Sequence, residues 1–151
     1  MKVILVSGTP GTGKTTYAKK IAKQKSYKYI DVNNVISSKN LSSGYDKKRD
    51  TKVIDTGKLN KILIKIINEE KKKKTKGLVI DSHLSHYLPK KYADLCVITK
   101  CDLKTLKKRL EKRGYSKDKV RENLDAEIFD VCRVEAIEKG HKVTVINTQR
   151  S

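Results

Sequence analysis

The 151-residue sequence lacks the features that mark membrane proteins and secreted proteins. No stretch approaches the roughly 20 apolar residues of a membrane span. Met1 leads straight into a strand-like run without a signal-peptide pattern. The three cysteines, Cys96, Cys101 and Cys132, form no CxxC pair, which argues against a disulfide framework or a zinc site and favours buried thiols. We therefore expect a cytoplasmic protein with no membrane partner.

Acidic residues are scarce relative to basic ones. The chain has 36 lysines and arginines against 17 aspartates and glutamates, which gives a net charge of +19. Such an excess attracts polyanions and makes nucleic-acid binding strongly salt-dependent. Most of these cations are lysines, which suit phosphate contacts or a solvated surface more than base reading. A biased genome composition would produce the same excess, so the charge alone leaves RNA binding open.

Short apolar runs alternate with helical periods along the whole chain, which is typical of βα units around a parallel sheet. The length fits one domain. We predict an α/β fold with a central five-stranded parallel sheet flanked by helices. The expected strands cover residues 2–7, 28–31, 77–81, 93–99 and 142–146, and the expected helices cover residues 14–24, 57–73, 102–113 and 119–139.

Two of these patterns predict how the layers pack. The apolar runs in 2–7 and 77–81 are too continuous for half-exposed strands, so helices should cover both of their faces. In the helix expected at 119–139, the residues of an apolar stripe are spaced by four or three. The stripe consists of Val120, Leu124, Ile128 and Val131. We expect it to pack on the sheet.

Residues 32–56 interrupt the alternation with Ser, Asn, Lys and Asp around a central Gly44-Tyr45-Asp46. The segment is long for a connection in a small domain, and structureless loops of that length are usually functional. We therefore predict a binding flap in this segment, with a short helix at about 33–39.

The strongest motif is the sequence GTPGTGKT at residues 8–15, which matches the GxxxxGK[ST] phosphate loop directly after a strand and before a helix. Its glycines allow a tight turn whose amides point inward, and the helix N-terminus adds partial positive charge. Lys14 would reach the β and γ phosphates, and Thr15 would offer its hydroxyl to Mg²⁺. A dinucleotide fingerprint does not fit, because Lys14, Thr15 and Thr16 stand where its third glycine is required. The predicted ligand is a nucleoside triphosphate.

A second pair of candidates follows the expected strand 77–81. Asp81 ends this apolar run, which is where phosphate-loop enzymes place a second ligand for Mg²⁺; a plain strand-terminating aspartate is the alternative. His83 lies two residues further on. It would orient a water molecule or contact a phosphate, or it is simply a histidine of a surface loop.

Arg109 and Arg113 lie four residues apart on one face of an expected helix, just before Gly114. Phosphoryl transfer needs cations that close over the transferring group and exclude water. We therefore predict a short lid at about 113–119, with Arg113 on phosphate and Arg109 against the base or a phosphate. Two solvated helix arginines are the alternative.

The order of these features resembles the nuclear-type adenylate kinases, the sixth-isoenzyme family, also described as coilin-interacting ATPases and small-subunit ribosome assembly factors, with archaeal members. The resemblance runs from about residue 2 to 146. A phosphate loop is shared by many kinases. The specific part is the Asp81-x-His83 turn combined with the RGY sequence at 113–115 and Glu127-Ile128-Phe129.

The resemblance implies a P-loop NTPase fold of the nucleoside monophosphate kinase type, which transfers the γ-phosphoryl group of MgATP to AMP. It also implies ATPase activity and a role in small-subunit maturation, with a ribosomal protein of the uS11 type and small-subunit rRNA as partners. It assigns ATP binding to Gly11, Gly13, Lys14, Thr15, Thr16, Arg109 and Asn147, with residues 146–148 near the adenine. It assigns catalysis to Lys14, Asp81, His83 and Arg113, Mg²⁺ to Thr15 and Asp81, and the AMP flap to Lys39, Gly44, Tyr45 and Asp46.

The flap departs from the family pattern. Where members usually have an arginine, this chain reads ISSK at 36–39, and Lys39 supplies only a point charge in place of a bidentate clamp. Two alternatives to an adenylate kinase therefore stay open: an ATPase-switched ribosome assembly or RNA-binding factor with little kinase activity, and a kinase for another nucleoside or small hydroxyl acceptor. Relatives also continue into a terminal helix after the last strand, so part of one sheet face is expected to be less covered.

Overall fold

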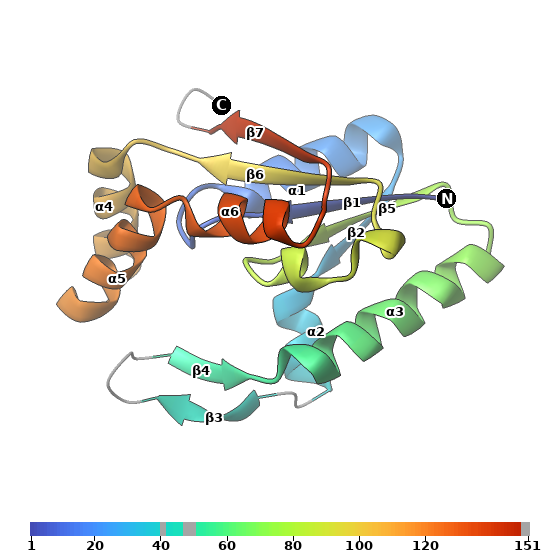
Figure 1. Ribbon diagram of the computed structural model, residues 1–151, viewed down its shortest axis with the longest axis horizontal. Coiled ribbons are helices and arrows are strands. Elements are labelled where there is room, and N and C mark those ends of the chain that lie inside the picture. The colour runs from blue at the N-terminus through green and yellow to red at the C-terminus, as the bar shows by residue number, and fades with distance from the viewer. Residues whose placement is uncertain (40–41, 47–50, 149–151) are drawn as a thin grey trace.

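The computed structural model describes residues 1–39, 42–46 and 51–148 of the chain, with the side chains of 42–46 and 51–53 left out. Figure 1 shows the arrangement of its helices and strands. In chain order they are β1 (Lys2–Ser7), α1 (Lys14–Lys25), β2 (Lys28–Asp31), α2 (Val32–Ser38), β3 (Ser42–Asp46), β4 (Thr51–Ile54), α3 (Thr56–Lys72), β5 (Gly77–Asp81), β6 (Leu95–Lys100), α4 (Leu103–Lys112), α5 (Lys117–Ile128), α6 (Val131–Glu138) and β7 (Val143–Asn147). Two 3₁₀ turns, η1 (Ser85–Tyr87) and η2 (Lys90–Tyr92), follow β5.

Five strands form one parallel sheet in the order β2-β5-β1-β6-β7, which confirms the predicted fold class. The register of β1 with β5 sets Val6 opposite Asp81. Because all five strands run the same way, their carboxyl ends meet at one edge of the sheet. The phosphate-loop motif and Asp81 therefore lie side by side at that edge.

Helices cover both faces of the central strands, as the continuous apolar runs predict. On one face, Ile4, Val6 and Val79 pack against α1. On the other face, Leu5 and Ile80 pack against α2, α3 and α6. The alternation along β1 and β5 sends successive side chains to opposite faces, so both layers are needed to bury these strands.

Helix α3 shows how the local sequence sets an element. The Asp55 side chain accepts a hydrogen bond from the Lys58 amide at 3.1 Å and caps the helix start. Leu59, Leu63 and Ile67 recur every four residues and are fully buried against the sheet. Lysines in the last turn face the negative end of the helix dipole.

The prediction of a single helix at 119–139 is wrong, because the chain forms two helices there, α5 and α6. Asp130 lies between them in a left-handed conformation with a φ of 57°, which aspartate tolerates better than most residues. Val120 packs on α4 with Leu106 and Leu110, away from the sheet, while Ile128 is 56% exposed. A helical period indicates an apolar face, but it specifies neither the surface that covers this face nor a break in the helix. The spacing therefore predicted an apolar face and did not predict the turn at Asp130.

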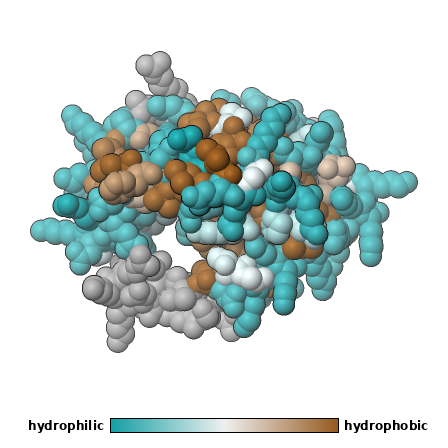
Figure 2. Space-filling model, in the orientation of Figure 1, coloured by the Kyte–Doolittle hydropathy of each residue, from teal (hydrophilic) through white to brown (hydrophobic). Residues whose placement is uncertain are grey.

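Apolar side chains consequently lie open to solvent over α5, α6 and β7, on a molecular face that is otherwise mostly hydrophilic (Figure 2). The exposed large hydrophobic residues of this region are Ile128, Phe129, Val131, Val134, Ile137 and Val145. Within the described ranges, no helix combines the length and apolar character that crossing a membrane requires.

The segment between α2 and α3 contains more regular structure than the sequence indicates. The short helix predicted at about 33–39 is present as α2, where the Asp31 side chain accepts from the Asn33 amide at 2.9 Å. Strands β3 and β4 then pair antiparallel in a two-stranded sheet of their own. Their polar sequences lack the alternation that predicts a half-buried strand, which is why the hairpin was not predicted.

Candidate active site

The phosphate-loop motif forms a turn between β1 and α1 whose backbone requires glycine, as Gly8 and Gly13 show. Gly8 has a φ of 147°, and a Cβ atom there would lie 2.5 Å from the Thr99 hydroxyl oxygen. Gly13 has a φ of 85° and is the N-cap of α1. Both conformations are in the region that side chains disfavour. The backbone of residues 8–13 can therefore wind tightly in front of the α1 N-terminus.

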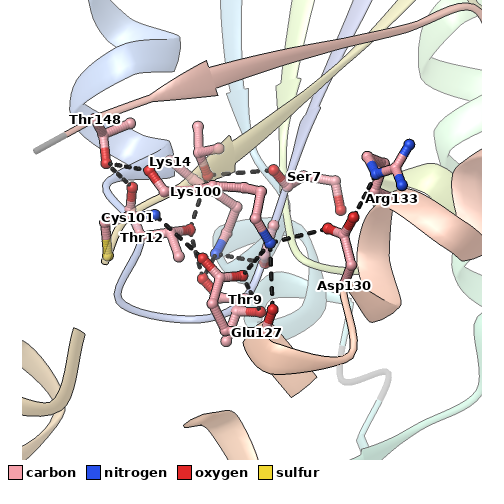
Figure 3. Close-up of polar contacts among 12 residues, drawn as sticks. Ser7, Thr9, Thr12, Lys14, Lys100, Cys101, Glu127, Asp130, Arg133 and Thr148 are labelled. Atoms are coloured by element: carbon pink, nitrogen blue, oxygen red, sulfur yellow. Dashed lines mark hydrogen bonds and ion pairs between the residues drawn. The ribbon is translucent and has the colours of Figure 1, made fainter. Parts of the chain in front are cut away.

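Buried threonine hydroxyls fix the inside of this turn (Figure 3). Thr12 Oγ1 donates to the Thr9 carbonyl at 2.6 Å and lies 2.8 Å from Thr99 Oγ1 of β6. Thr148, just after β7, donates its hydroxyl to the Thr12 carbonyl. Two segments distant in the sequence, together with a bond inside the loop, thus hold the loop in one shape.

Lys14 begins α1, and its ammonium group lies against the loop itself. Its Nζ donates to the Gly8 carbonyl at 3.0 Å and to the Thr9 carbonyl at 3.2 Å. Burial lowers the pKa of Lys14 to about 8, although the nearby Cys132 and Asp81 favour its charged form. The free protein therefore keeps a poorly solvated cation beside the loop, where an anion would replace the missing water.

Asp81 ends β5 with its side chain turned toward the start of α1. It is only 4% exposed, and its Oδ2 accepts from Thr15 Oγ1 at 2.8 Å and from the Tyr29 hydroxyl at 2.6 Å. Burial and the adjacent Asp81 carboxylate raise the pKa of Tyr29, so the phenol stays a hydrogen-bond donor. The sequence did not indicate a role for Tyr29, because only the pairing of β2 with β5 brings it to Asp81.

His83 lines the same cleft as Asp81. Desolvation by the cleft, together with the charge of Lys14, lowers the pKa of His83 to about 4. The imidazole is therefore neutral near pH 7 and can accept a hydrogen bond.

Arg109 and Arg113 come from the end of α4, as the helical spacing predicts. Arg109 Nη1 donates to the Gly11 carbonyl at 3.2 Å, so the helix contacts the outer side of the phosphate loop. Arg113 is the C-cap of α4, immediately before the turn to α5.

Two hollows flank the loop and meet there. The larger one, of about 590 Å³, extends from the loop past Asp81 and His83 to α5 and α6. The second, of about 510 Å³, lies toward Arg109 and Thr148. The residues that line both are Gly11, Gly13, Thr16 and Arg113. Both volumes are typical of small-molecule sites.

Some residues that the resemblance assigns lie away from these hollows. Lys39 is the exposed C-cap of α2 and does not line either of the described hollows, and the same holds for Asn147 at the end of β7. Gly44, Tyr45 and Asp46 belong to β3, but their side chains lie outside the described part of the chain. Two described residues of the flap segment, Asn33 and Ile54, do line the larger hollow, as does Asp31 directly before it.

Several lining residues were not assigned from the sequence. Lys119 and Asn123 come from α5, Glu135 from α6 and Tyr87 from η1. No motif marks them, because each reaches the cleft only through the packing of its element: α5 packs on α4, and α6 packs on η1. Regular spacing along one helix does not reveal such contacts.

Comparison with known proteins agrees with this geometry. The family described as AAA domain matches residues 4–130. A protein of Methanosarcina acetivorans named "Putative adenylate kinase" is 42% identical over 147 residues, covering 97% of this chain and 77% of its own. A protein of Pyrococcus furiosus with the same name is 36% identical over 146 residues, covering 97% and 74%.

Solved structures show the same fold at low sequence identity. A sugar kinase from Janibacter has a TM-score of 0.64 at 16% identity, covering 97% of this chain and 85% of its own. Deoxyadenosine kinase from M. mycoides with bound dATP has a TM-score of 0.52 at 15% identity, covering 97% and 90%.

A parallel sheet in this order, with a phosphate loop after its central strand, defines the P-loop kinase class, and the protein is a phosphotransferase. Within that class, the chain belongs to the adenylate-kinase-like family that includes these archaeal relatives.

Proposed function

We propose that the protein is an adenylate kinase of the nuclear type that transfers the γ-phosphoryl group of MgATP to AMP. The observation that supports this most strongly is the pair of hollows that meet at the phosphate loop. A hydrolase needs one nucleotide pocket, whereas transfer between nucleotides needs two that converge on the phosphoryl group. The smaller hollow, beside Arg109 and Thr148, takes the base of ATP, and the larger one takes AMP.

The charges around the loop suit phosphoryl transfer. The transferring group spreads negative charge over its oxygens, and fixed cations stabilise that charge. Lys14 exchanges its hydrogen bonds to the two loop carbonyls for contacts with the β and γ phosphates. Gly11, Gly13 and Thr16 contact the same phosphates from the loop and from the start of α1. Arg113, which borders both hollows, is placed to bridge donor and acceptor.

The donor set also fits a magnesium ion. Thr15 Oγ1 and the Asp81 carboxylate are hard oxygen ligands 2.8 Å apart beside the loop, which is the chemistry that Mg²⁺ prefers. These two residues would hold the ion, which supplies charge neutralisation on the phosphates when it is bound. The Tyr29 hydroxyl keeps the Asp81 carboxylate aimed at this position.

The acceptor phosphate needs a cation that the flap helix does not supply. Lys39 does not line the larger hollow, so the described part of the flap offers no counterpart to a family-type arginine clamp. Arg113 and Lys119 do line this hollow. Arg113 directly follows α4, and Lys119 lies in the first turn of α5. We assign the acceptor phosphate to these two residues, and the 113–119 segment then acts as the lid that closes over both nucleotides.

A second candidate is ATP hydrolysis coupled to ribosome assembly. The neutral His83 beside Lys14 favours it, because such an imidazole can position an attacking water molecule. The proposed partners are small-subunit rRNA and a ribosomal protein of the uS11 type. They rest on the family resemblance and on the +19 charge, which would hold an rRNA backbone. Capture of no small-subunit component in any nucleotide state would contradict this role.

The test of the kinase is ADP formation from ATP and AMP with the purified protein. We expect two ADP per AMP consumed, loss of turnover when EDTA removes divalent ions, and little ADP from ATP alone. ADP released at the same rate with and without AMP would contradict the kinase activity and support ATP hydrolysis. Turnover only with a nucleoside or another hydroxyl compound in place of AMP would identify a different acceptor.

ATP affinity should fall as the pH rises through about 8. The pKa of Lys14 is lowered to about 8 in the free protein, and bound phosphates would raise it again, so binding requires a protonated Lys14. Affinity is then full below pH 8 and falls by up to tenfold per pH unit above it. The phosphate groups titrate near pH 6 and do not contribute there.

Calorimetric titration with MgATP at pH 7, 8 and 9 measures this effect. Lys14→Arg is the control, because a guanidinium stays charged over the whole range and should flatten the pH dependence. An affinity that stays constant between pH 7 and 9 in the unmodified protein would contradict the assignment.

A further inference from the structure

Three carboxylates that line the larger hollow have no part in the chemistry described above, those of Asp31, Glu122 and Glu135, and Glu135 is the one that a buried histidine contacts. Glu135 lies on α6, one turn after Val131 and Cys132, and all three line the hollow. Its side chain is 31% exposed. Glu135 Oε2 accepts from the Tyr87 hydroxyl at 2.6 Å, and Oε1 lies 3.3 Å from His86 Nε2.

These two partners fix the direction of the carboxylate. His86 is 1% exposed, and its Nδ1 lies 2.7 Å from Ser7 Oγ. Burial lowers the pKa of His86, so the ring is neutral: Nε2–H donates to Glu135 and Nδ1 accepts from the Ser7 hydroxyl. Ser7 is the last residue of β1, immediately before the phosphate loop. The carboxylate is therefore held by a buried network that begins at Ser7, directly before the phosphate loop.

Glu135 keeps hydrogen-bonding capacity on its open side. An ionised carboxylate offers about four lone-pair sites, and Tyr87 and His86 use two of them. Desolvation and the hydrogen bond to Glu135 raise the pKa of Tyr87, so its hydroxyl remains a donor and does not compete as an acceptor. Glu135 lines the hollow, where a ligand with hydrogen-bond donors would complete the set.

Charge is distributed unevenly around this hollow. Its described lysine and arginine lining residues are Lys14, Arg113 and Lys119, from the start of α1 and from the α4–α5 lid, and Glu122 of α5 is the acidic residue that lines it from the same helix as Lys119. The wall built by α6 and η1 instead contributes Glu135 with Tyr87 and the apolar Leu84, Val131 and Cys132. A phosphate belongs at the first group and is repelled by the second. The second group suits the flat, partly apolar nucleoside part of an acceptor.

We propose that Glu135 determines acceptor specificity by accepting a hydrogen bond from a donor on the nucleoside, either the exocyclic amine of the base or a ribose hydroxyl. This inference rests on the proposed function, in which the larger hollow binds the acceptor. An acceptor without that donor leaves the carboxylate desolvated and unpaired, which is the situation in which polar sites discriminate strongly. We expect such an acceptor to be used about 10-fold to 100-fold less efficiently.

Three nucleotides test this against AMP. Purine riboside 5′-monophosphate lacks the 6-amino group, and 2′-deoxy-AMP and 3′-deoxy-AMP each lack one hydroxyl. The unmodified protein should discriminate against at least one of them in kcat/KM, and the one it rejects identifies the donor that Glu135 reads. In Glu135→Gln the discrimination should shrink to about threefold or less, with the KM for ATP unchanged.

Two further variants complete the set. Glu138→Gln removes a charge from the same helix at an exposed position outside the described hollows, and should behave as the unmodified protein. Tyr87→Phe retains the carboxylate but removes its closest donor, and should weaken discrimination to an intermediate degree. It also tests the inference if Glu135→Gln does not fold.

Equilibrium binding separates this inference from the proposed function. The same four nucleotides are titrated into each variant in the presence of a non-hydrolysable ATP analogue. Absence of transfer to all four would overturn the proposed kinase, but their relative affinities would still report on Glu135. Equal affinity for all four, or equal discrimination in the unmodified protein and in Glu135→Gln, would overturn the inference.

Discussion

Replacing Lys14 by methionine should lower kcat/KM for ADP formation from ATP and AMP by about 10³-fold or more. Methionine has a similar length and no charge, so the change removes the ammonium group and leaves the packing of α1 in place. Removal of one fixed donor from a transition state costs about 10² to 10³ in rate, and a charged donor costs more. The ammonium group also holds the Gly8 and Thr9 carbonyls in the free protein.

The matched control for this variant is Lys20→Met, which removes an exposed lysine from the same helix. It should leave turnover within about twofold, because solvent screens an exposed charge. Circular dichroism should show both variants folded, since neither lysine belongs to the buried apolar clusters of the fold. A Lys14→Met protein that retains a tenth or more of the activity would remove Lys14 from the mechanism.

The sequence predicted the part of the site that is local in the chain. The loop, Lys14 and Thr15 form one continuous motif whose glycines can adopt one kind of turn. Asp81 was also predictable, because parallel strands place their carboxyl ends at the same edge. The inference for the loop needed only a strand followed by a helix, whereas that for Asp81 also assumed that its strand lies beside β1, as the sheet order shows.

The residues that the sequence missed depend on contacts between distant segments. Tyr29 meets Asp81 because β2 lies next to β5, and Glu135 meets His86 because α6 packs beside η1. The turn at Asp130 that redirects α6 was itself invisible to a helical period. Side-chain chemistry at such positions is set by topology, so residue spacing could not have identified it.

Glu127 shows how the turn between α5 and α6 is tied to the loop (Figure 3). Its Oε1 accepts from Thr9 Oγ1 at 3.2 Å and from Lys100 Nζ at 3.1 Å. Its Oε2 accepts from the Cys101 amide at 3.1 Å. Lys100 also pairs with Asp130 at 2.9 Å. One carboxylate therefore joins the phosphate loop, the end of β6 and the last turn of α5.

Replacing Glu127 by alanine should lower the free energy of unfolding by about 3 kcal/mol or more. Its side chain is 5% exposed, so its loss leaves the Cys101 amide and the Thr9 hydroxyl without their acceptor in a buried region. Unpaired buried donors cost about 1–3 kcal/mol each. Lys100 retains Asp130 and the Glu127 carbonyl, which limits the penalty from its charge. Urea denaturation followed by circular dichroism measures the difference.

Asp125→Ala is the control for this variant, because it also removes an acidic side chain from α5 but leaves the Glu127 network intact. Asp125 faces Arg121 at 3.8 Å, and both side chains are largely exposed, so this change should cost about 0.5 kcal/mol or less. Equal destabilisation by the two variants would show that Glu127 contributes only as one more charge of α5. If the network holds the loop, Glu127→Ala should also raise the KM for ATP, because Thr9 loses its fixed partner. Asp125→Ala should leave that constant unchanged, since its side chain makes no described contact with the loop.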